Sequence, residues 1–136
     1  MKNRCVLLSG PAVADDEDLD IGLQNYAVVF KNPDNNRLET ISSEKKIDLI
    51  LLELLDEHPA ETEVIKKIKA RHPHLEIIVI AGASDSEMLA KAFECGAKDA
   101  FRKPYKTALI VERIAALLYH QEHVGMQLTD EDEALE

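Results

Sequence analysis

The stretch IDLILLELL, residues 47–55, decides the fold class, because it combines an apolar run with a single embedded carboxylate. Residues 47–52 are rich in isoleucine and leucine, which is typical of a strand that is buried on both faces. Such strands occur in parallel sheets that helices cover on both sides. Glu53 stands between Leu52 and Leu54, where an unpaired charge would cost free energy. The sequence therefore raises the question of what compensates this charge.

Strand and helix patterns alternate along the rest of the chain. The segment between the first two strands is weakly helical at best, because Gly22 and five acids leave little apolar face. A capping box at Ser84 and Glu87 begins one helix, and Gly96 ends it. The alternation of strands and helices predicts an α/β domain with a parallel sheet and right-handed crossovers. We expect strands at residues 5–8, 26–30, 47–52, 75–80 and 99–102, and further helices at 35–46, 62–70 and 107–119.

The composition limits the possible functions. With 136 residues, 46% hydrophobic and 31% charged, the chain has room for one ordinary domain. No apolar run is long enough for a membrane span, and Cys5 and Cys95 lack the spacing of a disulfide framework, so we expect a cytoplasmic protein. The net charge of -10 argues against nucleic-acid binding by this domain.

The carboxyl ends of parallel strands are where such sheets form their sites. Here those ends carry Ser9 and Gly10, Glu53, Ala81 and Gly82, and Lys103. The stretch GAKDAFRKPY, residues 96–105, has a glycine-alanine pair after a helix and a lysine-proline pair after a strand. With these motifs, residues 3–120 resemble the receiver domain of two-component response regulators, the CheY-like superfamily. The resemblance implies a five-stranded sheet of order 2-1-3-4-5 in a flavodoxin-like fold, and a signalling domain rather than an enzyme.

The resemblance also assigns roles to individual positions. It places Glu53 where receivers hold the aspartate that accepts a phosphoryl group, and Lys103 at the position of the family's lysine. The remaining positions depart from the family pattern. Ser9 and Gly10 replace two magnesium-binding acids, Ala81 replaces a threonine or serine, and Ala100 replaces an aromatic residue.

The changes in charge at these positions are consistent with one another. Without the two acids there is little to hold magnesium, whose binding we expect to be lost. Without a metal, phosphoryl transfer loses its main charge stabiliser. We therefore expect Glu53 and Lys103 to form an ion pair in a degenerate pseudo-receiver that acts by protein–protein contact, independently of phosphorylation.

The expected partners are an output domain, another protein or a second copy of the chain. The homodimer surface would comprise the helix ending at Gly96, the strand 99–102 and the helix 107–119. Residues 1–120 form the expected receiver-like domain, and residues 121–136, with Gly125 and many acids, form an acidic linker or tail.

Several alternatives stay open. Glu53 could mimic a phosphorylated state, or the receiver could still be phosphorylated in an unusual fashion. A flavodoxin-like module could hold a phosphate or nucleotide at SGPAVAD, residues 9–15. The acids at 15–18 could replace the missing metal ligands, although a solvated loop is the simpler interpretation. The histidine pairs 72/74 and 120/123 have metal-binding spacing but no third ligand nearby in sequence.

Overall fold

The computed structural model describes residues 4–55, 59–82 and 86–134. Its centre is a five-stranded sheet of order β2-β1-β3-β4-β5, in which all neighbouring strands pair in parallel. This is the predicted strand order. The strands are β1 (Cys5–Ser9), β2 (Val28–Asn32), β3 (Leu49–Glu53), β4 (Glu76–Ala81) and β5 (Asp99–Arg102).

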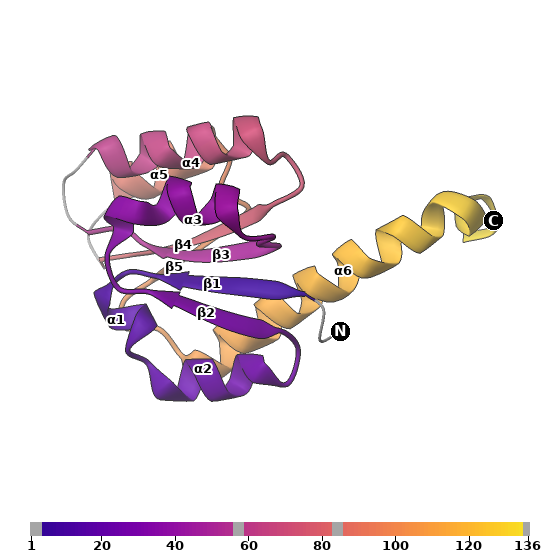
Figure 1. Ribbon diagram of the computed structural model, residues 1–136, viewed down its shortest axis with the longest axis horizontal. Coiled ribbons are helices and arrows are strands. Elements are labelled where there is room, and N and C mark those ends of the chain that lie inside the picture. The colour runs from indigo at the N-terminus through magenta and orange to yellow at the C-terminus, as the bar shows by residue number, and fades with distance from the viewer. Residues whose placement is uncertain (1–3, 56–58, 83–85, 135–136) are drawn as a thin grey trace.

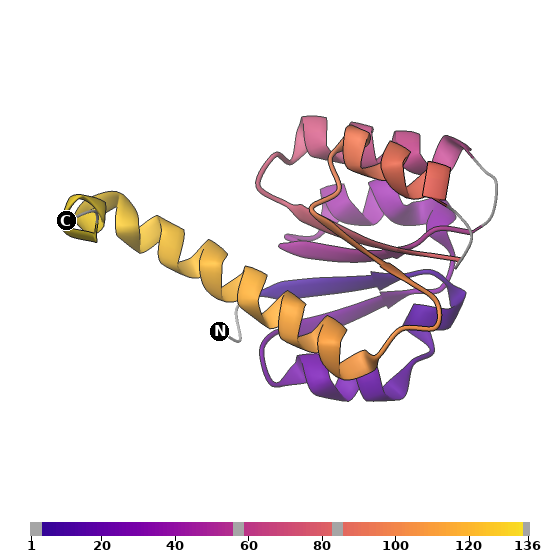
Figure 2. The same cartoon turned by 180° about the vertical axis from the view of Figure 1, so that it is seen from behind.

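Helices cover both faces of the sheet, as Figures 1 and 2 show. One face carries α3, α4 and α5, and the other carries α1, α2 and the first part of α6. The helices are α1 (Pro11–Ala14), α2 (Glu17–Gln24), α3 (Leu38–Glu44), α4 (Pro59–Arg71), α5 (Ser86–Cys95) and α6 (Thr107–Ala134), and the short 3-10 helix η1 (Asn35–Arg37) precedes α3.

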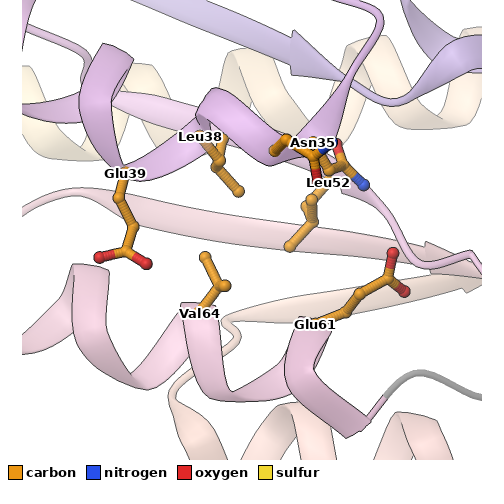
Figure 3. A pocket seen from close by; sticks show the side chains of 7 residues that line it. Asn35, Leu38, Glu39, Leu52, Glu61 and Val64 are labelled. Carbon is orange, nitrogen blue, oxygen red and sulfur yellow. The ribbon is translucent and has the colours of Figure 1, made fainter.

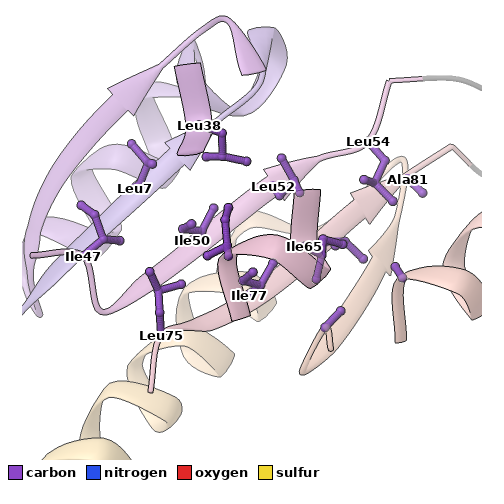
Figure 4. Packing of buried hydrophobic residues seen from close by; sticks show 14 of the residues in the cluster. Leu7, Leu38, Ile47, Ile50, Leu52, Leu54, Ile65, Leu75, Ile77 and Ala81 are labelled. Atoms are coloured by element: carbon purple, nitrogen blue, oxygen red, sulfur yellow. The ribbon is translucent and has the colours of Figure 1, made fainter. Parts of the chain in front are cut away.

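The two cores explain why the central strands are apolar without interruption. Side chains alternate across a strand, so Ile50 and Leu52 point to the α3–α4–α5 face while Leu49 and Leu51 point to the opposite face. Figure 4 shows the first of these clusters. Every residue of β3 is buried, and the same alternation places Glu53 on the side that α1, α2 and α6 cover.

The first crossover is more helical than the sequence pattern predicts. Asp16 caps α2 by accepting a hydrogen bond from the Leu19 N–H at 3.0 Å. Leu19 and Leu23 are fully buried, so two apolar residues one turn apart are enough to dock this acidic helix. The expectation of a weak helix was therefore wrong, because it weighed the acids and Gly22 above this short apolar stripe.

The strand bounds shift slightly toward the carboxyl end. Tyr26 and Ala27, predicted to begin a strand, instead donate their N–H groups to the Leu23 carbonyl and close α2. At the start of β3, Asp48 accepts the Cys5 N–H at 2.8 Å and pairs with Arg4 at 3.2 Å, which fixes the chain before the strand begins. Strands β1, β2, β3 and β4 each extend beyond the predicted end.

The last helix is longer than predicted. It continues to Ala134 and projects away from the sheet, so the segment expected to be a frayed tail is helical over most of its length. Gly96 has the predicted positive φ, at +123°. Ser84 of the predicted capping box lies outside the described residues. Among the described residues, no helix has the length and apolar character of a membrane-crossing segment.

Candidate functional site at the carboxyl end of the sheet

The strand register gathers the predicted site residues at one edge of the sheet. Ser9 is opposite Leu52, one residue before Glu53, and Ala81 is opposite Arg102, one residue before Lys103. The Lys103 N–H donates to the Ala81 carbonyl at 2.8 Å, which extends the β4–β5 ladder past the end of β5. All of these positions therefore lie at the carboxyl ends of neighbouring parallel strands, where the fold forms its sites.

Glu53 and Lys103 meet, as the sequence analysis expects. The Lys103 Nζ lies 2.6 Å from the Glu53 Oε2. The glutamate side chain is only 2% exposed, whereas the lysine side chain is 39% exposed. The carboxylate is thus removed from water while the ammonium group keeps part of its hydration, which lowers the desolvation cost of the pair.

The second carboxylate oxygen of Glu53 caps a helix. Its Oε1 accepts the N–H groups of Ala12 at 2.8 Å and Val13 at 3.2 Å, both in the first turn of α1. Gly10, the residue before that helix, has no side chain with which to cap it, and Pro11 has no N–H to satisfy. A side chain more than forty positions away in sequence from Ala12 therefore supplies the cap.

Gly10 is required by this arrangement. Its φ is +128°, a conformation that residues with a Cβ rarely adopt. A Cβ at this position would also lie 2.4 Å from the Glu53 Cβ and 2.6 Å from the Glu53 Oε1. The space that a side chain at position 10 would occupy is filled by the glutamate, so the departures from the family pattern at positions 10 and 53 depend on each other.

An uncharged hydrogen-bond chain surrounds Ser9, where the family pattern has an acid. The Ser9 hydroxyl donates to the Asn35 Oδ1 at 2.5 Å and accepts from the Asn32 Nδ2 at 3.2 Å. The Asn35 Nδ2 in turn donates to the Glu53 carbonyl at 2.9 Å. The sequence pattern assigned neither asparagine a role, because both lie beyond the predicted end of the second strand at residue 30.

A further contact closes over the site from two loops. The Tyr105 hydroxyl donates to the Asp16 Oδ2 at 2.7 Å and joins the start of α2 to the loop after β5. Burial, then the hydrogen bond to Asp16 and the negative charges of Asp16 and Glu53, raise the pKa of Tyr105 well above its usual range. Lys103, Asp16 and Tyr105 line an open cleft of about 590 Å³ beside the ion pair.

The residues at this edge do not fit an octahedral magnesium site. The Ser9 hydroxyl is held between two asparagines, Gly10 offers no ligand atom, and Asp16 uses its oxygens for the α2 cap and for Tyr105. Mg²⁺ is held chiefly by hard, charged oxygen ligands. Within residues 4–55, 59–82 and 86–134, no group of three or more histidine, cysteine or acidic side chains is placed to hold a metal.

The two alanines of the predicted site belong to the core. Ala81 is fully buried, and Ala100 is partly buried against the same apolar cluster. Neither side chain can donate a hydrogen bond or pack an aromatic ring toward Glu53. Ser9, Gly10, Glu53 and Lys103 thus meet in one connected site, whereas Ala81 and Ala100 contribute only backbone and apolar surface to it.

Comparison with proteins of known sequence finds relatives that match most of this chain. A cyclic di-GMP phosphodiesterase of Thermotoga maritima is 29% identical over 108 residues, which cover 75% of this chain and 29% of that protein. Response regulator RR06 of Streptococcus pneumoniae is 28% identical over 113 residues, which cover 78% of this chain and 51% of that protein. The chain therefore spans about half or less of the length of these curated relatives.

Solved structures share the fold. HP1043, an orphan response regulator of H. pylori, superposes with a TM-score of 0.75 at 24% identity, covering 85% of this chain and 97% of that one. A CheY-like receiver domain protein from Methanospirillum hungatei gives 0.76 at 20% identity, covering 88% and 97%. The sequence model of the response regulator receiver domain family matches residues 17–115, which is well over half of this chain. The chain belongs to the response regulator receiver domain family of two-component systems.

Proposed function

We propose that this receiver domain is a pseudo-receiver, which signals through a protein surface without being phosphorylated. One observation carries the proposal: both carboxylate oxygens of Glu53 are already bound within the chain. Oε2 binds Lys103, and Oε1 binds the N–H groups of Ala12 and Val13. Adding a phosphoryl group to this buried carboxylate would break these hydrogen bonds.

The chemistry of the surrounding residues supports this proposal. Phosphoryl transfer depends on positioning and on cations that neutralise the developing charge. Here Lys103 is already paired, Ser9 and Gly10 offer no carboxylate, and Ala81 offers no hydroxyl for a phosphoryl oxygen. Position 81 has no hydroxyl and position 100 has no aromatic ring. Both observations argue against Glu53 as a mimic of the phosphorylated state.

The alternative phosphate site at residues 9–15 conflicts with the geometry. The N–H groups of Ala12 and Val13 do form an anion-binding helix start, but the anion they bind is the Glu53 carboxylate. A free phosphate would have to displace a charge that is covalently part of the protein. We therefore do not propose a nucleotide-binding function for this loop.

The output is proposed to lie in a partner protein or in an additional domain. Because the chain covers only part of its curated relatives, their activities are not transferred to it. The proposed contact surface is formed by α5, β5 and α6, where Phe93 is 48% and Leu109 is 52% exposed. Lys91 and Lys98 are also exposed on this part of the chain, so a partner with an acidic, partly apolar surface would complement it.

Phosphodonor treatment tests the proposal. The protein is incubated with acetyl phosphate and Mg²⁺ and its intact mass is measured, with a conventional receiver domain as the reagent control. We expect an unchanged mass. A stable phosphoryl adduct that disappears in Glu53→Gln would overturn the proposal.

Light scattering tests self-association through the same surface. Molar mass is measured across a concentration series for the wild type, Phe93→Glu on α5 and the control Ile21→Glu on α2. Both residues are large, apolar and exposed. We expect the wild type to form dimers, Phe93→Glu to weaken them and Ile21→Glu to leave them unchanged. A wild type that stays monomeric removes the homodimer from the proposal and leaves a different protein as the partner.

A further inference from the structure

A basic face lies on the outer side of α4 and α5. Figure 3 shows Glu61 and Val64 on the side of α4 that faces α3, and Ile65 and Ile68 are buried against the sheet. The side of α4 that remains, together with α5 and its end, carries exposed basic side chains in a chain whose net charge is -10. The residues of this basic face are Lys66, Lys67, Arg71, Lys91 and Lys98.

Lys69 joins the carboxyl ends of α4 and α5. Its Cγ is so close to Gly96 that a Cβ on that glycine would lie 2.9 Å from it. Its Nζ donates to the carbonyls of Pro73 at 3.0 Å and Leu75 at 2.9 Å, which fixes the chain between α4 and β4. The two helix ends therefore lie side by side, and Lys98, two residues after Gly96, continues the basic face of α4.

The basic side chains of this face are not paired with acids in the described structure. Within the part of the chain that the structure describes, no ion pair involves any of them. Residues 64–75 contain no acid, and Glu94 is the only acid from Lys91 to Lys98. Phe93, which is 48% exposed, adds apolar surface on the same helix. Such a face is complementary to an acidic, partly apolar partner.

An acidic run stands at the end of α6. Residues 130–133 read DEDE, and the last turn of this helix contains no basic residue. Negative charge at the carboxyl end of a helix is unfavourable, because the helix dipole already places partial negative charge there. Figures 1 and 2 show that this end of α6 projects away from the sheet, and a helical segment without tertiary packing is marginal in water. A basic surface against the acidic end would offset both effects.

We propose that this acidic end, residues 130–133, binds the basic face of a second copy of the chain. Gln121 donates to the Asp48 carbonyl at 3.1 Å, and α6 leaves the sheet from there. At about 1.5 Å per residue the acidic end lies about 14–18 Å beyond Gln121, so a continuous helix carries it away from its own α4. Two copies that exchange acidic ends form a closed, two-fold pair. This pairing adds α4 to the contact surface of the proposed function and rests on that proposal.

Light scattering of two complementary full-chain variants tests the pairing. The first variant reverses two charges of the basic face, Lys66→Glu with Lys67→Glu. The second neutralises the acidic end, Asp130→Asn with Glu131→Gln, Asp132→Asn and Glu133→Gln. In about 50 mM salt we expect the wild type to associate and each variant alone to associate at least about tenfold more weakly. An equimolar mixture is expected to recover association, because one variant keeps the acidic end and the other keeps the basic face.

A charge-matched variant and added salt are the controls. Lys46→Glu with Lys106→Glu makes the same charge change at exposed positions outside the basic face and is expected to associate like the wild type. Salt at about 0.5 M is expected to abolish the association, because it screens exposed charges. Four results would each overturn the pairing: a monomeric wild type, a mixture as weak as either variant, equal weakening by the control, or association that survives the salt.

The strength of the contact sets the conditions of the measurement. Exposed ion pairs contribute little individually, so we expect the pairing only at high protein concentration. Unfolding that is followed in dilute solution therefore reports on the monomer.

Nucleic acid is the rival occupant of the basic face. An NMR titration of the full chain uses a single-stranded DNA oligonucleotide as the probe. Saturable amide shifts at Lys66, Lys67 and Lys98, in a protein whose variants do not associate when mixed, would assign the face to nucleic acid and overturn the second copy as its occupant.

The phosphodonor assay keeps this pairing separate from the proposed function. A phosphoryl adduct at Glu53 would refute the pseudo-receiver and leave the pairing to be judged by the mixture. A mixture that fails to associate, with an unchanged mass in the phosphodonor assay, would overturn the pairing alone.

Discussion

At the scale of single residues, Glu53 is the buried charge on which the site depends. Removing a carboxylate from water costs several kcal/mol, and one surface-type ion pair would not offset this cost. The structure offers three charge-assisted hydrogen bonds, from Lys103, Ala12 and Val13. Hydrogen bonds to charged groups contribute about 1.5–3 kcal/mol each, so the carboxylate is compensated within the chain.

Gly10→Ala tests the dependence between positions 10 and 53. The new Cβ would overlap the Glu53 side chain and would also require a rare backbone conformation. We expect the free energy of unfolding to fall by about 3 kcal/mol, the combined size of overpacking and left-handed strain. Urea denaturation measures it. Gly22→Ala in helix α2 is the control and should change stability by less than about 1 kcal/mol, because the gain in helix propensity is partly offset by the close approach of the new Cβ to the Val111 Cγ2, at 3.0 Å. A Gly10→Ala protein as stable as the Gly22→Ala control would contradict the described packing of Glu53.

Tyr105 gives the site a pH dependence in the alkaline range. Its pKa is higher in the folded protein than in the unfolded chain, where it is about 10, so folding favours the protonated phenol. The resulting stabilisation is complete below about pH 10 and is lost as the pH rises further. We expect the wild type to lose more stability between about pH 10 and pH 11.5 than Tyr105→Phe does in urea unfolding. The exposed Tyr119→Phe is the control, and equal losses in wild type and Tyr105→Phe would refute this assignment.

At the scale of elements, the sequence predicted most of the strands and helices because hydrophobic periodicity reflects burial. All five strands were predicted within two residues of their observed ends, because β1 to β4 each contain an apolar run and β5 is followed by a lysine-proline pair. Helix α1 of the first crossover could not be predicted, because its cap comes from Glu53, a contact between distant parts of the sequence. The same limit applies to Asn32 and Asn35, whose roles depend on the position of Ser9.

The extension of α6 leads to a prediction about the domain boundary. Among residues 107–121 of this helix, Ile110, Ile114 and Leu118 are fully buried, and Gln121 donates to the Asp48 carbonyl at 3.1 Å. We expect a chain ending after residue 121 to keep the free energy of unfolding within about 1 kcal/mol of the full chain, because helical propensity alone contributes little. Chemical denaturation of both proteins measures this. A loss of several kcal/mol would show that residues 122–136 belong to the domain rather than to a linker.

At the scale of the whole molecule, the parallel sheet brings together residues that are about fifty positions apart. Glu53 ends β3 and Lys103 directly follows β5, with β4 between these two strands, and the shared carboxyl edge allows the two side chains to meet. The family resemblance pointed to this edge, and the balance of charges predicted the ion pair that the structure contains. The resemblance could not reveal that the carboxylate also binds the first turn of α1, or that Asn35 bonds both the Ser9 hydroxyl and the Glu53 carbonyl.

The most direct test of the central claim is an NMR titration of the protein with beryllofluoride and Mg²⁺. These reagents form a phosphoryl-like adduct only on a receptive carboxylate. The account predicts that the amide signals of Ala12, Val13, Glu53 and Lys103 stay unchanged, because Glu53 is already bound on both oxygens. A second set of signals for these residues, in slow exchange with the first, would contradict it.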